Sequence, residues 1–303
     1  MKFFAALLGV LAFLGCKHAE TSGLSGEVAP QKSVLLVGFG GWNSCRLQTD
    51  LKQLPTPQGF ISQGQTALSS LLTPKESFTY GQLLNLAKTL TAAGVDVKWM
   101  STCFFVGLPV ERSIWFLNSD GRTGHVPSLA ISDEIKEFAG DREIILIGHS
   151  YGGWMSATVS TNINRPVLAT FTLEPISGES CPTSAALTGT ASQYEYCQRA
   201  PDANSVDLAR AQDNVRTWIN VYLEPEGRDL DIYSGPYPAP VENVTLSFKN
   251  LDPGPFGNAH HLLGLDKKTW DLICTRSAAL LNVSGACNGL NVDQWGRELH
   301  EPH

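Results

Sequence analysis

Residues 144–153 place a glycine-rich turn directly after an apolar run, and this stretch constrains the fold more than any other. It reads Ile-Ile-Leu-Ile-Gly-His-Ser-Tyr-Gly-Gly. A short continuous apolar run predicts a strand that is buried on both faces. The residues that follow, 151–162, predict a helix. A doubly buried strand joined to a helix is the repeating unit of a parallel sheet covered by helices.

The same alternation extends along the chain. Further apolar runs predict strands at residues 33–37, 95–100, 167–173, 215–223 and 244–248. Helical spacing of apolar residues predicts further helices at residues 80–93, 127–139 and 265–281. The predicted fold class is therefore α/β, with a mostly parallel central sheet and helices on both faces, in one domain over residues 33–303.

The N-terminus has the pattern of an export signal. Lys2 precedes an apolar run that is too short to span a bilayer, which predicts a signal peptide over residues 1–15. The run ends in Phe-Leu-Gly-Cys, which resembles the lipobox of bacterial lipoproteins. That resemblance implies a lipid on Cys16, a tether over residues 16–32, and a membrane-anchored exported protein, with the outer membrane favoured over a periplasmic location. A plain secretory signal is the alternative.

The remaining cysteines indicate disulfides, because an even number in an exported chain is typical of paired cysteines. Proximity in sequence favours the pairs Cys181–Cys197 and Cys274–Cys287, which leaves Cys45–Cys103. The first pair would staple residues 176–205, a Ser/Gly/Thr/Ala-rich excursion over the sheet that could form a lid. We predict no metal site, because no Cys-x-x-Cys pair and no Cys–His spacing suits zinc.

Charge limits the partners. The net charge of −7 argues against nucleic acid, because no basic stripe is present to neutralise phosphates. We expect no cofactor and a monomeric chain.

The turn at Gly148-His149-Ser150-Tyr151-Gly152 matches G-x-S-x-G. In a nucleophile elbow the serine lies on a sharp turn between a strand and a helix, and the glycines avoid collisions with neighbouring segments. The predicted strand and helix on either side supply that context. An ordinary glycine-rich turn is the alternative. His149 is not expected to be the base for Ser150, because adjacent side chains diverge on such a turn.

On these residues the chain resembles the α/β-hydrolase family, from residue 33 to about residue 285. The resemblance rests on the elbow, on residues 38–41 (Gly-Phe-Gly-Gly) after an early strand, and on late histidines. It implies a serine nucleophile, Ser150, whose base follows it in sequence. The candidate bases are His260, His261, His300 and His303. The last two lie in a charged tail, and the resemblance favours His261, with His260 as the alternative.

The acid has two candidate positions. Glu174 follows the predicted strand at 167–173 and precedes a proline, which resembles the Leu-Asp-Pro of pancreatic-lipase relatives. The loop after the next strand carries four other carboxylates, those of Glu224, Glu226, Asp229 and Asp231. We favour Glu174, because it is a lone carboxylate at a strand end.

The family's oxyanion site uses backbone amides. The resemblance assigns these to Tyr151 and to the 38–41 loop, where Phe39 is the first choice and Gly40 the second. The expected function is an exported serine hydrolase that cleaves carboxylic esters, including lipid esters, through an acyl-enzyme. Trp42 and Trp154 lie beside the predicted site in sequence. A catalytically silent binding lipoprotein and an amidase or thioesterase are the alternatives.

Overall fold

The apolar runs of the sequence form neighbouring strands of one sheet in the computed structural model. The residues that the structure describes are 32–41, 46–47, 72–73, 78–104, 113–127, 130–175, 205–223, 236–237, 239–246, 263–283 and 285–289. Among them, eight strands form one sheet in the order β10-β9-β8-β7-β1-β4-β5-β6. Their bounds are β1 (Ser33–Phe39), β4 (Asp96–Phe104), β5 (Ser113–Asn118), β6 (Thr123–Pro127), β7 (Glu143–His149), β8 (Val167–Leu173), β9 (Val215–Leu223) and β10 (Glu242–Leu246).

Most of this sheet is parallel. The pairs from β10 to β4 are all parallel, whereas β5 and β6 add an antiparallel hairpin at one edge. Two short strands, β2 (Arg46–Leu47) and β3 (Leu72–Thr73), pair separately. The predicted α/β class with a mostly parallel sheet is confirmed.

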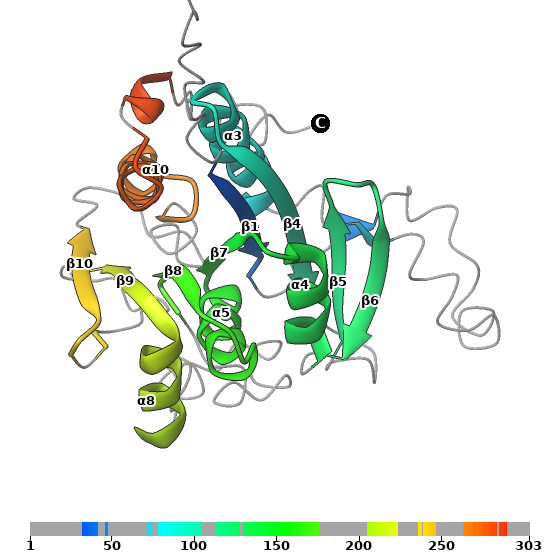
Figure 1. Cartoon of the computed structure of the whole chain (residues 1–303). Coiled ribbons are helices and arrows are strands. Elements are labelled where there is room, and N and C mark those ends of the chain that lie inside the picture. The colour runs from blue at the N-terminus through cyan, green and yellow to red at the C-terminus, as the bar shows by residue number, and fades with distance from the viewer. Residues whose placement is uncertain are drawn as a thin grey trace, which may run out of the picture. The chain divides into compact units, whose positions relative to one another are not determined.

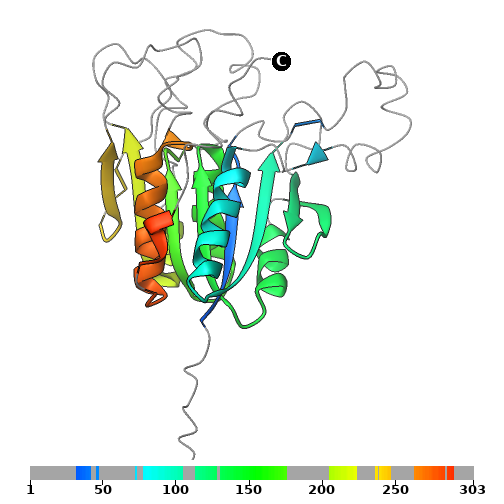
Figure 2. The same ribbon diagram turned by 90° about the horizontal axis from the view of Figure 1, so that it is seen from above.

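Helices cover both faces of the sheet, as Figures 1 and 2 show. One layer holds α3 (Phe78–Ala92) and α10 (Lys267–Leu280), and the other holds α4 (Ile131–Ala139), α5 (Tyr151–Asn162) and α8 (Ser205–Asn214). The buried residues form two hydrophobic clusters, one under each layer. Along the central strand β7, Ile144 and Leu146 belong to one cluster and Ile145 and Ile147 to the other, all at 0% exposure. Burial on both faces explains why this strand has no polar alternation.

The parallel strands all end at the same edge, toward which the arrowheads point in Figure 2. Phe39, His149 and Leu173 are the last residues of β1, β7 and β8 and therefore lie along this edge. In open α/β sheets, ligands bind outside the carboxyl ends of the strands. The serine predicted as a nucleophile follows His149 directly, so this edge is where a site is expected.

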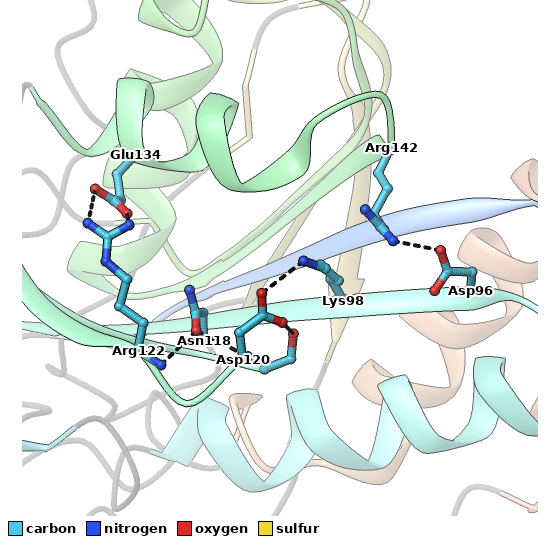
Figure 3. A network of polar contacts seen from close by, with 8 residues as sticks. Asp96, Lys98, Asn118, Asp120, Arg122, Glu134 and Arg142 are labelled. Carbon is cyan, nitrogen blue, oxygen red and sulfur yellow. Dashed lines mark hydrogen bonds and ion pairs between the residues drawn. The ribbon is translucent and has the colours of Figure 1, made fainter.

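The hairpin at the sheet edge is fixed by its turn and by ion pairs, which Figure 3 shows. The buried side chain of Asn118 accepts hydrogen bonds from the amides of Asp120 (3.1 Å) and Arg122 (3.0 Å). Around it, Lys98 pairs with Asp120 at 2.9 Å and Arg122 with Glu134 at 2.7 Å. Such partly exposed ion pairs contribute little individually, about 0–1 kcal/mol. The Asn118 turn is therefore the main local restraint.

Several sequence predictions differ from the structure. The hairpin β5–β6 and helix α8 were not predicted. β6 alternates between exposed and partly buried residues and includes few apolar ones, which is a weak strand signal. The helix predicted to begin at residue 127 begins instead at Ile131, because Pro127 still pairs with Ser113 in the hairpin.

One of the predicted disulfides is confirmed, between Cys274 in the middle of α10 and Cys287 in the 3-10 helix η4 (Ala286–Gly289). Cys103 is also disulfide-bonded, to a cysteine outside the described residues. Cys45, Cys181 and Cys197 lie outside the described residues, as does the excursion as far as residue 204. In the part of the chain that the structure describes, no helix is long and apolar enough to cross a membrane.

Candidate active site

Ser150 lies at the turn between β7 and α5, in a backbone conformation that few serines adopt. Its φ is 59° and its ψ is −128°, and it is the N-cap of α5. Four described residues other than glycine have positive φ: Ser150, Asn164, Glu174 and Asn282. Asparagine tolerates positive φ through local hydrogen bonding, whereas serine and glutamate have no such preference. The unusual backbone conformations are therefore at Ser150 and Glu174.

Steric crowding explains the glycines of the G-x-S-x-G turn. A Cβ atom at Gly148 would lie 2.0 Å from the carbonyl oxygen of Gly152. A Cβ atom at Gly152 would lie 2.2 Å from the carbonyl oxygen of Phe39 and 2.5 Å from that of Gly40. Backbone atoms cannot move aside as side chains can, so larger residues at either position would disrupt the turn. This is the crowding that a nucleophile elbow requires.

The loop after β1 lies against the serine. A Cβ atom at Gly41 would lie 3.1 Å from the Cβ of Ser150 and 3.6 Å from its Oγ. The amide of Gly40 donates to the carbonyl oxygen of Thr102 at 3.1 Å, and Phe39 is paired with strands on both sides. Gly41 therefore lies next to the Ser150 side chain, and a larger residue there would crowd it.

Tyr151 begins the helix that follows the serine. The first amides of a helix point out of its N-terminus and carry the positive end of its dipole. The Tyr151 ring lies edge-on to Phe104 at 4.6 Å between centroids and next to Trp154 at 5.2 Å. Tyr151 and Trp154 are partly exposed, so aromatic surface borders the start of the helix.

Glu174 lies at the end of the neighbouring strand β8 and is fully buried. The amide of Ser150 donates to the carbonyl oxygen of Leu173 at 2.8 Å. Because Leu173 directly precedes Glu174, this hydrogen bond places the backbone of Glu174 next to that of the serine. The amide of Glu174 donates to Val221 at 2.8 Å, and its carboxylate accepts the amide of Leu223. A buried carboxylate is costly without such partners. Its position beside the serine and its positive φ distinguish Glu174 from an ordinary residue at a strand end.

His149 directly precedes the serine and is 3% exposed. Its ring packs on Gly264, where a Cβ atom would lie 3.1–3.3 Å from the ring atoms. The carbonyl oxygen of Gly264 accepts the indole N–H of Trp270 at 2.8 Å, and Asp266 caps α10 through the amide of Thr269. The segment that leads into α10 is therefore held against the elbow.

The structure thus brings together Ser150, Tyr151, Phe39, Gly40 and Glu174 among the predicted site residues. The other candidates lie outside the described residues: His260, His261, His300, His303, Trp42, Glu224, Glu226, Asp229 and Asp231. Leu223 was not found from the sequence, and Gly41 was predicted only as part of the 38–41 loop. The Leu223 amide is 49 residues from the carboxylate that it binds, and a backbone donor leaves no local sequence signal.

Across the described ranges, no group of three or more His, Cys, Asp or Glu side chains could hold a metal ion.

Comparisons with known proteins give distant structural similarities. Est1E from Butyrivibrio proteoclasticus with ferulic acid bound is 12% identical, with a TM-score of 0.37 over 82% of this chain and 90% of that chain. A second structure of Est1E from Butyrivibrio proteoclasticus is 10% identical, with a TM-score of 0.34 over 82% of this chain and 89% of that chain. A Staphylococcus aureus protein of unknown function has 9% identity and a TM-score of 0.34 over 85% and 92%. No family model and no curated protein matches the chain. The activity therefore has to be argued from the site residues.

Proposed function

We propose that the chain is a serine hydrolase that cleaves carboxylic esters through an acyl-enzyme on Ser150. The observation that carries this proposal is the backbone of Ser150, at φ 59° between a buried strand and a helix, with glycines that no larger residue could replace. Strained conformations persist where the surrounding structure enforces them, and they cluster at functional sites. An ordinary turn has no need of this strain.

The proposed reaction has two halves. The Oγ of Ser150 attacks the ester carbonyl carbon while His261 accepts the hydroxyl proton, and the alcohol then leaves with that proton. Water next attacks the acyl-enzyme, His261 accepts a proton from it, and the carboxylic acid is released as Ser150 regains its hydrogen. Glu174 would orient the histidine and stabilise its protonated form.

Glu174 is favoured as the acid by three of its features: burial, positive φ, and the backbone link from Leu173 to Ser150. The Leu223 amide binds its carboxylate, which holds the side chain in one orientation. These contacts support the choice over the carboxylates of residues 224–231.

The base is proposed to be His261, with His260 as the alternative. The support is the packing of Gly264 on His149, because Gly264 follows the histidine pair closely in sequence and His149 adjoins Ser150. For the oxyanion, the amide of Tyr151 is one proposed donor. The loop after β1 would give the other, where Gly41 is now preferred to Phe39 because Phe39 is paired within the sheet.

We also propose that the chain is exported and anchored through a lipid on Cys16, as the N-terminal sequence indicates. Its substrates would then be esters outside the cytoplasm, including lipid esters. Partly exposed Tyr151 and Trp154 beside the serine offer apolar surface to such a substrate.

Steady-state hydrolysis of p-nitrophenyl esters of increasing chain length tests the proposal. We expect turnover by the wild type, its loss in Ser150→Ala, and a fall in kcat of about 10³- to 10⁴-fold in Glu174→Gln, as in other triads. Ser119→Ala, at an exposed serine in the β5–β6 turn, is the matched control and should keep full activity. A folded wild type that turns over no ester, amide or thioester would favour the binding-protein alternative. Normal turnover by Glu174→Gln would move the acid to residues 224–231.

A further inference from the structure

A row of polar side chains crosses three parallel strands just below Glu174. Thr172 on β8 pairs with Asn220 on β9, and Asn220 pairs with Asn243 on β10, in direct register. The Thr172 hydroxyl donates to the Asn220 side-chain oxygen at 3.0 Å, and the Asn220 amide donates to the Asn243 side-chain oxygen at 3.0 Å. The indole N–H of Trp218 donates to the Thr172 hydroxyl at 3.2 Å.

This row is costly to bury unless its hydrogen bonds form. Thr172 and Asn220 are both 0% exposed, and Trp218 is 6% exposed. Apolar residues of similar size could fill the same space, because the strands on either side consist largely of buried apolar residues. A hydrogen-bonded pair contributes little net stability relative to apolar packing, but it is expensive to leave unpaired. Stability alone therefore does not account for the row.

The row can instead fix the strand register. Side chains alternate with a period of two, so sliding β9 by two residues would keep apolar side chains facing the same layers. The same slide would separate Thr172 from Asn220 and leave both side chains buried without these partners. The polar row thus excludes a register that apolar contacts would tolerate.

Register matters here because the backbone of β9 binds Glu174 at two points. Its amide donates to Val221, and its carboxylate accepts the amide of Leu223. These two partners lie one and three residues beyond Asn220. We propose that Thr172 is a positioning residue, which fixes the orientation of the Glu174 carboxylate through the register of β8 and β9. The inference rests on the proposed role of Glu174.

The test compares two substitutions at Thr172 with one at Thr170. Thr172→Val keeps the shape and removes the hydroxyl, whereas Thr172→Ser keeps the hydroxyl. Thr170→Val is the matched control, because Thr170 lies on the same strand and face, is also 0% exposed, and also bonds a buried hydroxyl, that of Ser160 at 2.9 Å. Trp218→Phe is a second variant, which removes the indole N–H that donates to the Thr172 hydroxyl.

In the full-length chain, we expect Thr172→Val to lower kcat on a p-nitrophenyl ester by about 10- to 100-fold, the scale of a small misplacement of a catalytic group. KM should stay within about twofold. Thr172→Ser and Thr170→Val should keep kcat, and Trp218→Phe should lower it by a smaller factor. In a Glu174→Gln background, Thr172→Val should cost nothing further, because residues that act through one another are not additive. Equal losses in Thr172→Val and Thr170→Val, or an equal loss in both backgrounds, would overturn the proposal.

A structural readout separates this proposal from the proposed activity. In protein labelled with ¹⁵N-leucine, the amide signal of Leu223 should move in Thr172→Val and stay in place in Thr170→Val. If the wild type has no Ser150-dependent turnover but the Leu223 signal moves as expected, the proposed function fails and the positioning of the carboxylate stands. An unmoved Leu223 signal in Thr172→Val overturns the positioning whatever the activity shows.

Discussion

Replacing Ser150 by glycine should give a more stable protein than replacing it by alanine, although both changes remove the hydroxyl. The reason is the backbone of Ser150, whose φ of 59° and ψ of −128° lie outside the regions that residues with a Cβ atom prefer. Glycine adopts positive φ at no steric cost. Alanine keeps the Cβ atom and therefore the strain.

The size of the difference follows from two opposing effects. A residue held in a sparsely populated backbone region costs about 1–3 kcal/mol. Glycine lowers the free energy of unfolding by about 0.5–1 kcal/mol relative to alanine, because it loses more conformational freedom on folding. From the middle of each range, the Ser150→Gly variant should therefore exceed Ser150→Ala by about 1 kcal/mol in free energy of unfolding. In a domain of this size, each kcal/mol corresponds to about 2–4 °C in Tm.

Thermal and urea unfolding of the two variants measure this difference. The pair Ser119→Gly and Ser119→Ala is the control, because Ser119 lies in an exposed turn and is not among the described residues with positive φ. There, glycine should be no more stable than alanine. Equal stability of the two Ser150 variants, or a less stable glycine variant, would refute the inference that the elbow is strained.

Three further predictions concern the surroundings of the site. Burial raises the pKa of Tyr237, whose hydroxyl has no hydrogen-bond partner among the described residues, so the unfolded state ionises first and wild-type stability should fall as the pH rises above about 10. Urea unfolding at pH 8 and pH 11 should show this loss in the wild type and a smaller one in Tyr237→Phe, in which the raised pKa of Tyr80 still acts. Gly264→Ala should lower the free energy of unfolding by about 1–3 kcal/mol through its clash with the His149 ring, and adding His149→Ala should restore part of that loss. Replacing Cys274 and Cys287 by alanine should lower stability by about 2–4 kcal/mol in thermal unfolding while kcat stays unchanged, because the disulfide joins α10 to η4 and neither cysteine is a proposed site residue.

The fold could be predicted from the sequence where burial leaves a direct pattern. Strands 167–173 and 215–223 have the predicted bounds, because each includes a strong apolar run. Helix 151–162 also has its predicted bounds, because it follows the G-x-S-x-G turn directly. The β5–β6 hairpin could not be found in this way. Its outer strand lies at an exposed sheet edge, where few residues need to be apolar.

The site could be predicted in part for a related reason. Ser150 and its glycines are close in sequence, so the crowding of the turn is visible in the G-x-S-x-G pattern. Glu174 was chosen by its place at a strand end; the structure shows it buried and at positive φ, and its role as the acid stays a prediction. The Leu223 amide could not be predicted, because β8 and β9 are brought together by tertiary pairing. The choice between His260 and His261 remains a prediction.

Covalent labelling of Ser150 tests the central claim most directly. Folded wild-type protein, Ser150→Ala and the control Ser119→Ala would be treated with a fluorophosphonate, and the modified residue would be located by peptide mass spectrometry. The proposed mechanism predicts one label per chain, on Ser150, in the wild type and in Ser119→Ala, with slower labelling in Glu174→Gln and no label in Ser150→Ala. Label that persists in Ser150→Ala, or a folded wild type that takes no label, would contradict the assignment of Ser150 as the nucleophile.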